Sequence, residues 1–247
     1  MLETLMGFTD HLEELRRRLL IAVAAILLAT TVAFFLAGPL LQLLLLPSGG
    51  MQLKAFSLMD GFLIKWQVAL YAGIVVAFPV WAYELYAFVS PGLLDNERRA
   101  IVPPLIISLV LFVIGALFGY YLLWGMIRVL RQLFPPEVDY LASADDYISF
   151  VVFFLLACGL AFQLPTLLVI LAQLRIISSA LLRRHRRIAY FALFAFAEII
   201  TPVADPIVAP MTVMVPLVAL FEISIWLIVR IEAGRKHSAA ARAEPAG

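Results

Sequence analysis

The sequence predicts an all-α polytopic membrane protein with six transmembrane helices. Of its 247 residues, 64% are hydrophobic and 14% are charged, whereas a soluble domain carries roughly 45–50% apolar and about 25% charged residues. The apolar residues fall in long runs, and a span needs about 20 of them to cross a hydrocarbon core of about 30 Å. We therefore expect residues 1–230 to form a single six-helix transmembrane domain.

The apolar runs place the spans in order along the chain. They cover about Leu19–Leu36, Trp66–Val89, Ile101–Trp124, Tyr147–Leu174, Ile188–Thr201 and Ile207–Val229. Leu40–Leu46 is apolar but short, so a surface helix is expected there. Only 13 residues separate Arg187 from Thr201, which is about 20 Å of helix, and two prolines interrupt the sixth run, so spans five and six should be short. The charged, Ala-rich tail 231–247 should be disordered.

Basic residues predict the orientation of the chain in the membrane. Fourteen of the 18 lysines and arginines lie in segments on the side of the N-terminus, and four lie on the opposite side. Because basic loops stay in the cytoplasm, both termini should be cytoplasmic, in a multi-pass protein of the cytoplasmic (inner) membrane. The first run, with 18 residues, is longer than a signal-peptide core of roughly 7–15, and we interpret it as a retained first span.

The densest charge cluster of the first half, His11–Leu20, comes just before the first span. As a helix it places Leu12, Leu15 and Leu19 on one face and Glu14 on another, one turn before Arg18. This pattern is typical of an amphipathic helix at a membrane surface. It leaves two interpretations open, because Glu14 could serve a ligand or could simply pair with Arg18.

Polar residues inside the apolar runs are candidates for function. They are Glu84, Gln163, Glu198 and Glu222, together with Asp205 in the turn between spans five and six. Glu84 could reach the interface, and the others could form interhelical hydrogen bonds that hold the bundle together. The serines have no histidine or lysine at useful spacing, and no histidine pair or cysteine pair has the spacing of a metal site. No catalytic residue, metal site or cofactor is therefore predicted.

Three stretches together resemble the TatC family, the polytopic receptor of the twin-arginine protein translocase. They are His11-Leu12-x-Glu14-Leu15-Arg16-x-Arg18-Leu19 before span one, Phe88-x-x-Pro91-Gly92-Leu93-x-x-x-Glu97-Arg98 after span two, and Thr201-Pro202-x-x-Asp205-Pro206 between spans five and six, followed by Pro216 and Phe221-Glu222. The resemblance covers nearly the whole chain, and its first two motifs are specific in combination.

The resemblance implies two sets of site residues. The signal-peptide-binding set is Glu14, Arg16, Arg18, Phe88, Pro91, Gly92, Leu93, Glu97 and Arg98. The intramembrane set associated with partner contacts is Gln163, Glu198, Asp205, Ala209 and Glu222. Two positions depart from the family's pattern, since the family commonly has Gln at the position of Ala209 and often Glu at that of Gln163.

The implied function is that of a non-enzymatic translocase subunit. It would bind twin-arginine signal peptides of folded precursor proteins at the cytoplasmic face. With TatA-like and TatB-like single-span partners, it would drive export with the proton motive force. Membrane lipid and a second copy of the chain are further partners that the sequence allows, and no nucleic acid is expected. An ion-coupled secondary transporter is the main alternative, although the internal repeats that it predicts are not evident; an intramembrane protease and a structural scaffold are the others.

Overall fold

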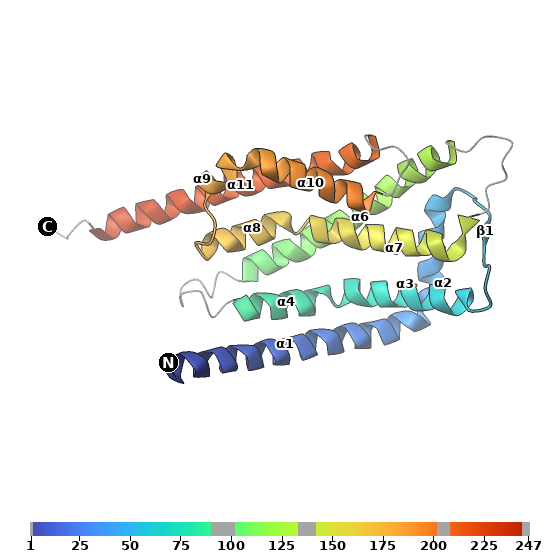
Figure 1. Ribbon diagram of the computed structural model, residues 1–247, viewed down its shortest axis with the longest axis horizontal. Coiled ribbons are helices and arrows are strands. Elements are labelled where there is room, and N and C mark those ends of the chain that lie inside the picture. The colour runs from blue at the N-terminus through green and yellow to red at the C-terminus, as the bar shows by residue number, and fades with distance from the viewer. Residues whose placement is uncertain (1, 90–101, 133–141, 202–207, 244–247) are drawn as a thin grey trace. The chain divides into compact units, whose positions relative to one another are not determined.

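The computed structural model describes residues 2–89, 102–132, 142–201 and 208–243, and these are overwhelmingly helical. The helices are α1 Leu2–Phe35, α2 Ala37–Leu45, α3 Asp60–Val76, α4 Phe78–Val89, α6 Val102–Gln132, α7 Ala144–Ala161, α8 Leu164–Gln173, α9 Ser179–Arg184, α10 Arg186–Ile200 and α11 Val208–Ala243 (Figure 1). The chain divides into two compact units, 1–159 and 160–247. The two-residue strands β1 Leu53–Lys54 and β2 Ala142–Ser143 pair in parallel within the first unit.

Four helical stretches of the described part are long and apolar enough to cross a membrane. They are Leu12–Phe35, Leu105–Val129, Ala144–Gln173 and Pro210–Gly234. A fifth is formed if the bent pair Asp60–Val76 and Phe78–Phe88 counts as one span. Each stretch falls on a predicted span, and the remaining predicted span is the short helix α10. Its 15 residues correspond to about 22 Å at 1.5 Å per residue, so a short fifth span stays our interpretation.

The second predicted span is not one straight helix. It begins at Asp60, earlier than expected, and breaks at Ala77 with a bend of 51°. Pro79, in the first turn of α4, explains the break, because proline lacks an amide donor and its ring clashes with the carbonyl four residues earlier. Close to the break, the Trp81 indole N–H donates to the carbonyl of Ile74 at 3.0 Å. This bond gives the Ile74 carbonyl a partner close to the point where the helical hydrogen bonds are interrupted.

Close helix contacts organise the first unit, in which α1 packs against both α3 and α4. At the α1–α3 crossing, the Cα of Gly73 lies so close to Thr30 that a Cβ there would be 2.6 Å from the Thr30 amide nitrogen. A second cluster joins α4 to α6, where the rings of Phe78 and Phe112 stack with centroids 4.1 Å apart. Gly159 of α7 allows the same Phe112 ring to approach its backbone. Small residues thus set the helix spacing, as is common in membranes.

Hydrogen bonds that cross between elements hold the end of the first unit that carries α2 and the two strands. Asp60, at the start of α3, accepts the backbone amides of Phe56 and Ser57 at 2.7 and 2.9 Å. Gln67 of α3 donates to Asp145 and accepts from the Ser149 hydroxyl, both at 3.0 Å. This chain of polar side chains connects α3 to α7 within apolar surroundings.

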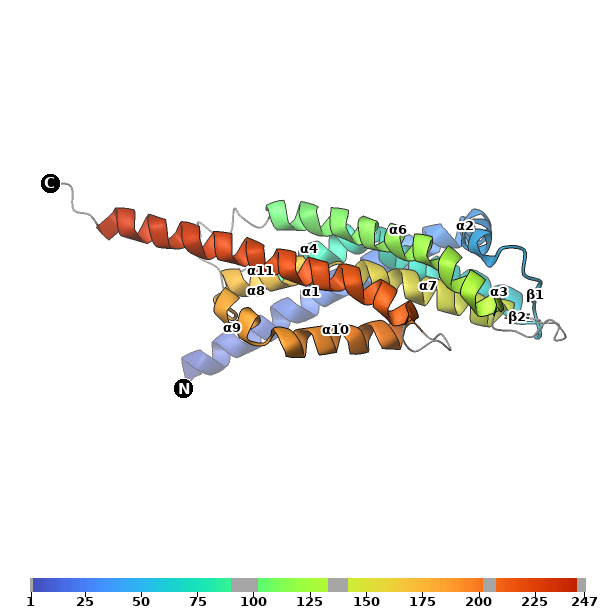
Figure 2. The same ribbon diagram turned by 90° about the horizontal axis from the view of Figure 1, so that it is seen from above.

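The second unit consists of α8, α9, α10 and α11, with α11 in contact with the other three (Figures 1 and 2). The short helix α9 lies between the predicted fourth and fifth spans. Its first residue, Ser179, donates to both carboxylate oxygens of Glu232 on α11, from the amide at 2.9 Å and from the hydroxyl at 2.5 Å. This pair fixes α9 to α11.

Three boundaries differ from the sequence prediction. The helix α6 runs to Gln132, beyond the predicted end of the third span at Trp124. The helix α11 continues to Ala243, well into the tail that was predicted to be disordered from residue 231. The stretch Leu40–Leu46, predicted as a surface helix, is formed by α2 and the first residue of the 3-10 turn Leu46–Ser48.

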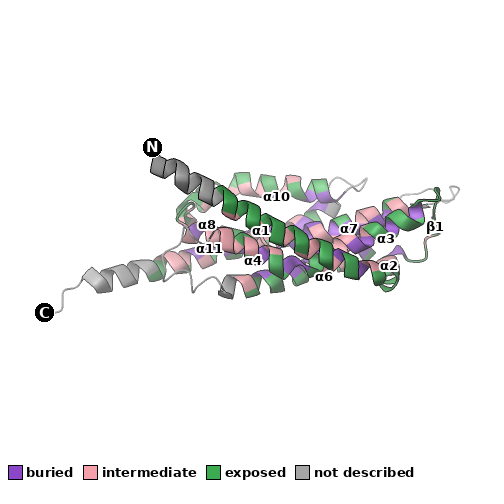
Figure 3. Cartoon of the chain, turned by 90° about the horizontal axis from the view of Figure 1, so that it is seen from below, coloured by how far each residue is buried: buried purple, intermediate pink, exposed green. Residues whose placement is uncertain are grey.

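Apolar side chains cover much of the surface of these helices. From Leu12 to Phe35, the helix α1 is largely exposed (Figure 3), including Leu20, Leu28 and Phe35 at 58%, 70% and 83%. In a soluble protein such a continuous apolar surface would be a liability. Here it is the surface that hydrocarbon chains cover, since lipid replaces water around a transmembrane helix.

Candidate functional site

An arginine held by two glutamates joins α1 to α4. The Nε and Nη2 atoms of Arg18 donate to Glu14 Oε1 at 3.0 and 2.6 Å, and Nη1 donates to Glu84 Oε2 at 3.0 Å. Glu14 lies one turn before Arg18 on α1, which is the spacing that lets side chains on a helix meet. Glu84 comes from α4, 66 positions further along the chain.

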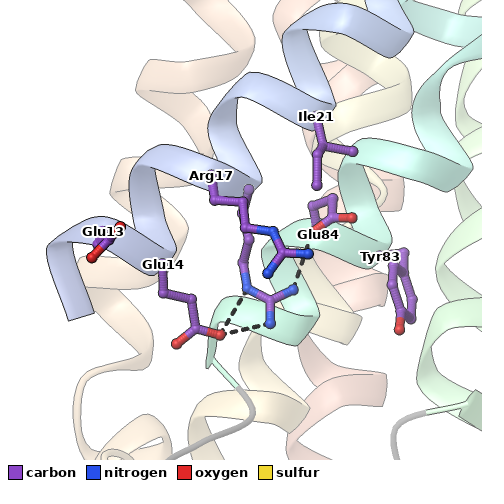
Figure 4. Close-up of a pocket in the computed structure, with 7 residues that line it drawn as sticks. Glu13, Glu14, Arg17, Ile21, Tyr83 and Glu84 are labelled. Atoms are coloured by element: carbon purple, nitrogen blue, oxygen red, sulfur yellow. Dashed lines mark hydrogen bonds and ion pairs between the residues drawn. The ribbon is translucent and has the colours of Figure 1, made fainter. Parts of the chain in front are cut away.

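These side chains line an open pocket of about 570 Å³ (Figure 4). Its lining residues are Glu13, Glu14, Arg17, Arg18, Ile21, Tyr83 and Glu84. The side chains of three glutamates, two arginines and one tyrosine therefore line one pocket. Figure 4 shows Glu14 and Glu84 directed from two different helices toward the same guanidinium. We call this arrangement the α1–α4 pocket.

The charged side chains of the α1–α4 pocket differ in how far they are buried. The side chains of Glu14 and Arg18 are 33% and 24% exposed, whereas that of Glu84 is only 12% exposed. A carboxylate as buried as Glu84 is costly without a partner, because the lost hydration has to be replaced by charged hydrogen bonds. Arg18 supplies them. The Arg18–Glu84 ion pair is therefore partly buried, and its contribution to stability depends more on hydrogen-bond geometry than that of an exposed ion pair does.

The structure places only part of the predicted signal-peptide-binding set. Glu14 and Arg18 lie together in the α1–α4 pocket, and the pairing of the two that the sequence left open is present. Arg16 is exposed on α1 outside the pocket lining, and Phe88 is half-buried near the end of α4. The others lie outside the described residues: Pro91, Gly92, Leu93, Glu97 and Arg98.

Sequence reasoning missed that Glu84, Tyr83, Glu13 and Arg17 share the pocket with Glu14. Glu84 was interpreted as a carboxylate that reaches the interface. The sequence did contain a signal for the partner of Glu84, because a lone acid near one end of an apolar run needs a cation at the same membrane depth. The arginines just before span one, at the same side of the membrane, are the candidates for that cation.

A second polar cluster lies within the second unit. Glu222 of α11 accepts from the Arg186 guanidinium at 2.7 Å and from the Tyr190 hydroxyl at 2.6 Å, and both donors belong to α10. The side chains of Arg186 and Glu222 are 43% and 36% exposed. This arrangement agrees with the interpretation of Glu222 as an interhelical hydrogen-bonding group, since its carboxylate joins α10 to α11.

Comparison with known proteins assigns the chain to a family. The model of the family described as Sec-independent protein translocase protein (TatC) matches residues 10–216. The chain belongs to the TatC family. It is 35% identical over 229 residues to the Sec-independent protein translocase protein TatCy of Bacillus subtilis, covering 90% of this chain and 88% of that protein. It is 36% identical over 227 residues to TatC of Deinococcus radiodurans, covering 88% and 84% respectively.

Solved structures agree with this assignment. The fold matches a crystal structure of the twin-arginine translocase receptor TatC in DDM with a TM-score of 0.79 and 32% identity, over 88% of this chain and 99% of that one. A second crystal structure of the TatC receptor matches with a TM-score of 0.75 and 34% identity, over 88% and 97%. The predicted all-α polytopic membrane fold and the predicted family are thereby confirmed.

Membership of the TatC family defines the coarse function. The chain is a multi-pass integral membrane component of the Sec-independent, twin-arginine protein translocase, and it is not an enzyme. This assignment favours the translocase over the secondary transporter. In the described part of the chain, no three His, Cys, Asp or Glu side chains are grouped so that they could hold a metal ion.

The residues predicted for partner contacts lie, where the structure describes them, in the second unit. Gln163 is the residue before α8, Glu198 is exposed on α10, and Ala209 lies in the first turn of α11. Asp205 lies outside the described residues. The carboxylate of Glu222 bonds to α10, and its donors, Arg186 and Tyr190, are residues that the resemblance did not single out.

Proposed function

We propose that the chain is the translocase subunit that recognises twin-arginine signal peptides of folded precursor proteins, and that Glu14 is one of the groups that receive the signal's arginines. The observation that carries the proposal is the α1–α4 pocket, in which the Glu14 carboxylate already holds a guanidinium group. The names of the solved relatives, which describe a twin-arginine translocase receptor, support the same role.

Carboxylate chemistry explains how such a receptor would select arginine. A guanidinium group presents parallel N–H donors to a carboxylate, whereas the ammonium of lysine is a point charge with no such fork. Charge-assisted hydrogen bonds contribute about 1.5–3 kcal/mol each, so the loss of one bond per arginine lowers affinity by about ten-fold or more. Glu97, from the second TatC motif, is proposed as the other acceptor of the signal.

Peptide binding to the full-length protein in detergent tests this proposal. A twin-arginine signal peptide should bind at least ten-fold more tightly than its Lys-Lys counterpart. Glu14→Gln and Glu97→Gln should reduce both the affinity and this preference, with little change in melting temperature. Glu13→Gln is the matched control, because it removes a carboxylate from the same turn of α1 that makes no hydrogen bond within the described residues. Equal binding of the two peptides by the folded parent protein would refute the proposal.

The orientation and the driving force follow from the same proposal. We place the Arg16–Arg18 end of α1 in the cytoplasm of a cell with an inner membrane, with six spans and both termini on that side. Folded precursors would be recognised there, and the proton motive force would drive their transport. The asymmetry of basic residues along the sequence supports this orientation.

Single-span subunits of the TatA-like and TatB-like kinds are the proposed partners, and α10 and α11 are their proposed docking surface. The Glu222 carboxylate already has donors in Arg186 and Tyr190, so a partner is not required to neutralise it. Its proposed role is to hold the docking surface in shape. Disulfide crosslinking to a partner should fall in Glu222→Ala and rise in Ala209→Gln, which restores the residue common in the family. Unchanged crosslinking in both variants would count against this docking surface.

A further inference from the structure

We propose that Glu84 is a second carboxylate of the signal-binding site, and that Arg18 occupies Glu14 and Glu84 at rest until a guanidinium of the signal peptide takes its place. This inference rests on the proposed signal-peptide function and adds to it both a residue and a mechanism of exchange. Arg18 in the α1–α4 pocket then takes the place of the signal's arginine while no ligand is bound.

The first argument is that the structure holds a guanidinium group on these two carboxylates. Three N–H donors of Arg18 reach Glu14 and Glu84 at 2.6–3.0 Å. The geometry that receives Arg18 is the geometry that an arginine of the signal needs. Since Glu84 comes from α4 and Glu14 from α1, a guanidinium held by both carboxylates also joins the two helices.

The second argument is the cost of an empty site. Glu84 is 12% exposed, and a carboxylate at that depth without a cation would destabilise the resting protein. Exchange of one guanidinium for another avoids this cost, because both carboxylates stay paired before and after binding. A site that kept its acids unpaired while waiting for the signal would be hard to maintain.

The third argument is the balance of charges and acceptors. The lining of the pocket carries three carboxylates and two guanidinium groups, which leaves one formal negative charge. Within the described residues, no side chain or amide donates to Glu14 Oε2 or to Glu84 Oε1. Each carboxylate therefore retains an oxygen that can receive an incoming N–H donor while Arg18 is still bound. Stepwise exchange is then feasible without an unpaired intermediate.

Access to the pocket is consistent with exchange. It is open rather than enclosed, and Tyr83 and Ile21 provide the side chains beside the ion pair (Figure 4). Arg18 is 24% exposed, so its guanidinium can turn toward water when it is displaced. Lysine in the signal would exchange poorly, because the three N–H donors of an ammonium diverge from one nitrogen and lack the planar fork of a guanidinium.

Two substitutions measured by peptide affinity separate exchange from a permanent structural bridge. Arg18→Gln removes the internal competitor, so exchange predicts that twin-arginine peptide affinity rises by about three- to ten-fold. A permanent bridge predicts an unchanged or lower affinity. Arg17→Gln is the charge-matched control: it removes the same charge from the same pocket but leaves both carboxylates bonded to Arg18. The rise should be clearly larger for Arg18→Gln than for this control.

Glu84→Gln tests the acceptor and remains informative if Arg18→Gln does not fold. Its amide oxygen can still accept the Arg18 hydrogen bond, so the protein should stay folded. Affinity for the twin-arginine peptide should drop about ten-fold, and more than in Glu13→Gln. Stabilisation by ligand gives a second readout, because a saturating peptide should raise the melting temperature of Arg18→Gln more than that of the parent.

The outcomes distinguish this inference from the proposed function. If the parent does not prefer arginine over lysine, and Glu14→Gln changes nothing, the signal-peptide function itself is wrong. If the parent and Glu14→Gln behave as proposed, but folded Arg18→Gln gains no affinity or Glu84→Gln loses none beyond Glu13→Gln, the exchange is wrong while the function stands. A gain in the first variant and a loss in the second support the exchange.

Discussion

Replacing Gly73 by alanine should separate α1 from α3. A Cβ at this position would lie 2.6 and 2.7 Å from the Thr30 amide nitrogen and Cα, and it would overlap the Thr30 hydroxyl. Ordinary van der Waals contact begins near 3.4 Å, so the two backbones must move apart by about 0.8 Å. Overpacking of this kind costs about 1–3 kcal/mol. Thr30→Ala should not restore stability, because the overlap is with backbone atoms.

The control for this prediction lies on the same helix. A Cβ at Gly61 would meet nothing within 4 Å, so Gly61→Ala should be neutral, or stabilising by up to about 1 kcal/mol from helix propensity. The difference between the two variants isolates the cost of the close approach. For a chain of this length, each kcal/mol shifts the melting temperature by roughly 2–4 °C, so Gly73→Ala should melt several degrees below Gly61→Ala.

The protein carries its own unfolding reporter. Its single cysteine, Cys158, is 2% exposed, so a thiol-reactive fluorescent dye should label it only when the helices come apart. Melting curves in detergent, followed by this dye, give the required temperatures. Identical melting of Gly73→Ala and Gly61→Ala would refute the reasoning, since the α1–α3 crossing would then have room for a methyl group.

Three further changes test other features. In a variant with Cys158 replaced, an impermeant thiol reagent applied outside intact cells should label Ser143→Cys and not Ser178→Cys; the reverse pattern would overturn the proposed orientation. Asp60→Ala removes the acceptor of two backbone amides and should cost about 1–2 kcal/mol of stability, measured by the same melting assay, and an unchanged melting temperature would argue against that role. Glu222→Ala leaves Arg186 without its carboxylate and should destabilise the protein by about 1–3 kcal/mol, a prediction that fails if it melts like the parent.

One contact of the α1–α4 pocket could be predicted from sequence spacing, and the other could not. The Glu14–Arg18 pair follows from a separation of four residues on a helix, and it was among the interpretations that the sequence left open. The meeting of Arg18 with Glu84 depends on which spans are neighbours, and hydrophobic periodicity carries no information about that. The two residues are 66 positions apart in the sequence, far beyond the range of a local pattern.

The fold shows the same division. Long apolar runs predicted the positions of the spans, because length and hydropathy alone decide whether a helix can cross a bilayer. Pro79, in the middle of the second run, is a signal in the sequence for the break at Ala77. The extension of α11 to Ala243 follows from a tail rich in alanine, the strongest helix former, which outweighs its charge. The close approach at Gly73 needed the three-dimensional structure.

The break at Ala77 has a consequence for local opening. The backbone hydrogen bonds of an unbroken helix tend to open together, whereas a break lets one half open and exchange its amide protons without the other. Both halves pack against α1, but Phe78 of α4 also stacks on Phe112 of α6. Removal of the cation from Glu84, as in Arg18→Gln, should therefore speed amide exchange in α4 and leave that of α3 unchanged. The bend would make α4 a separately opening segment whose stability depends on the cation that Glu84 holds.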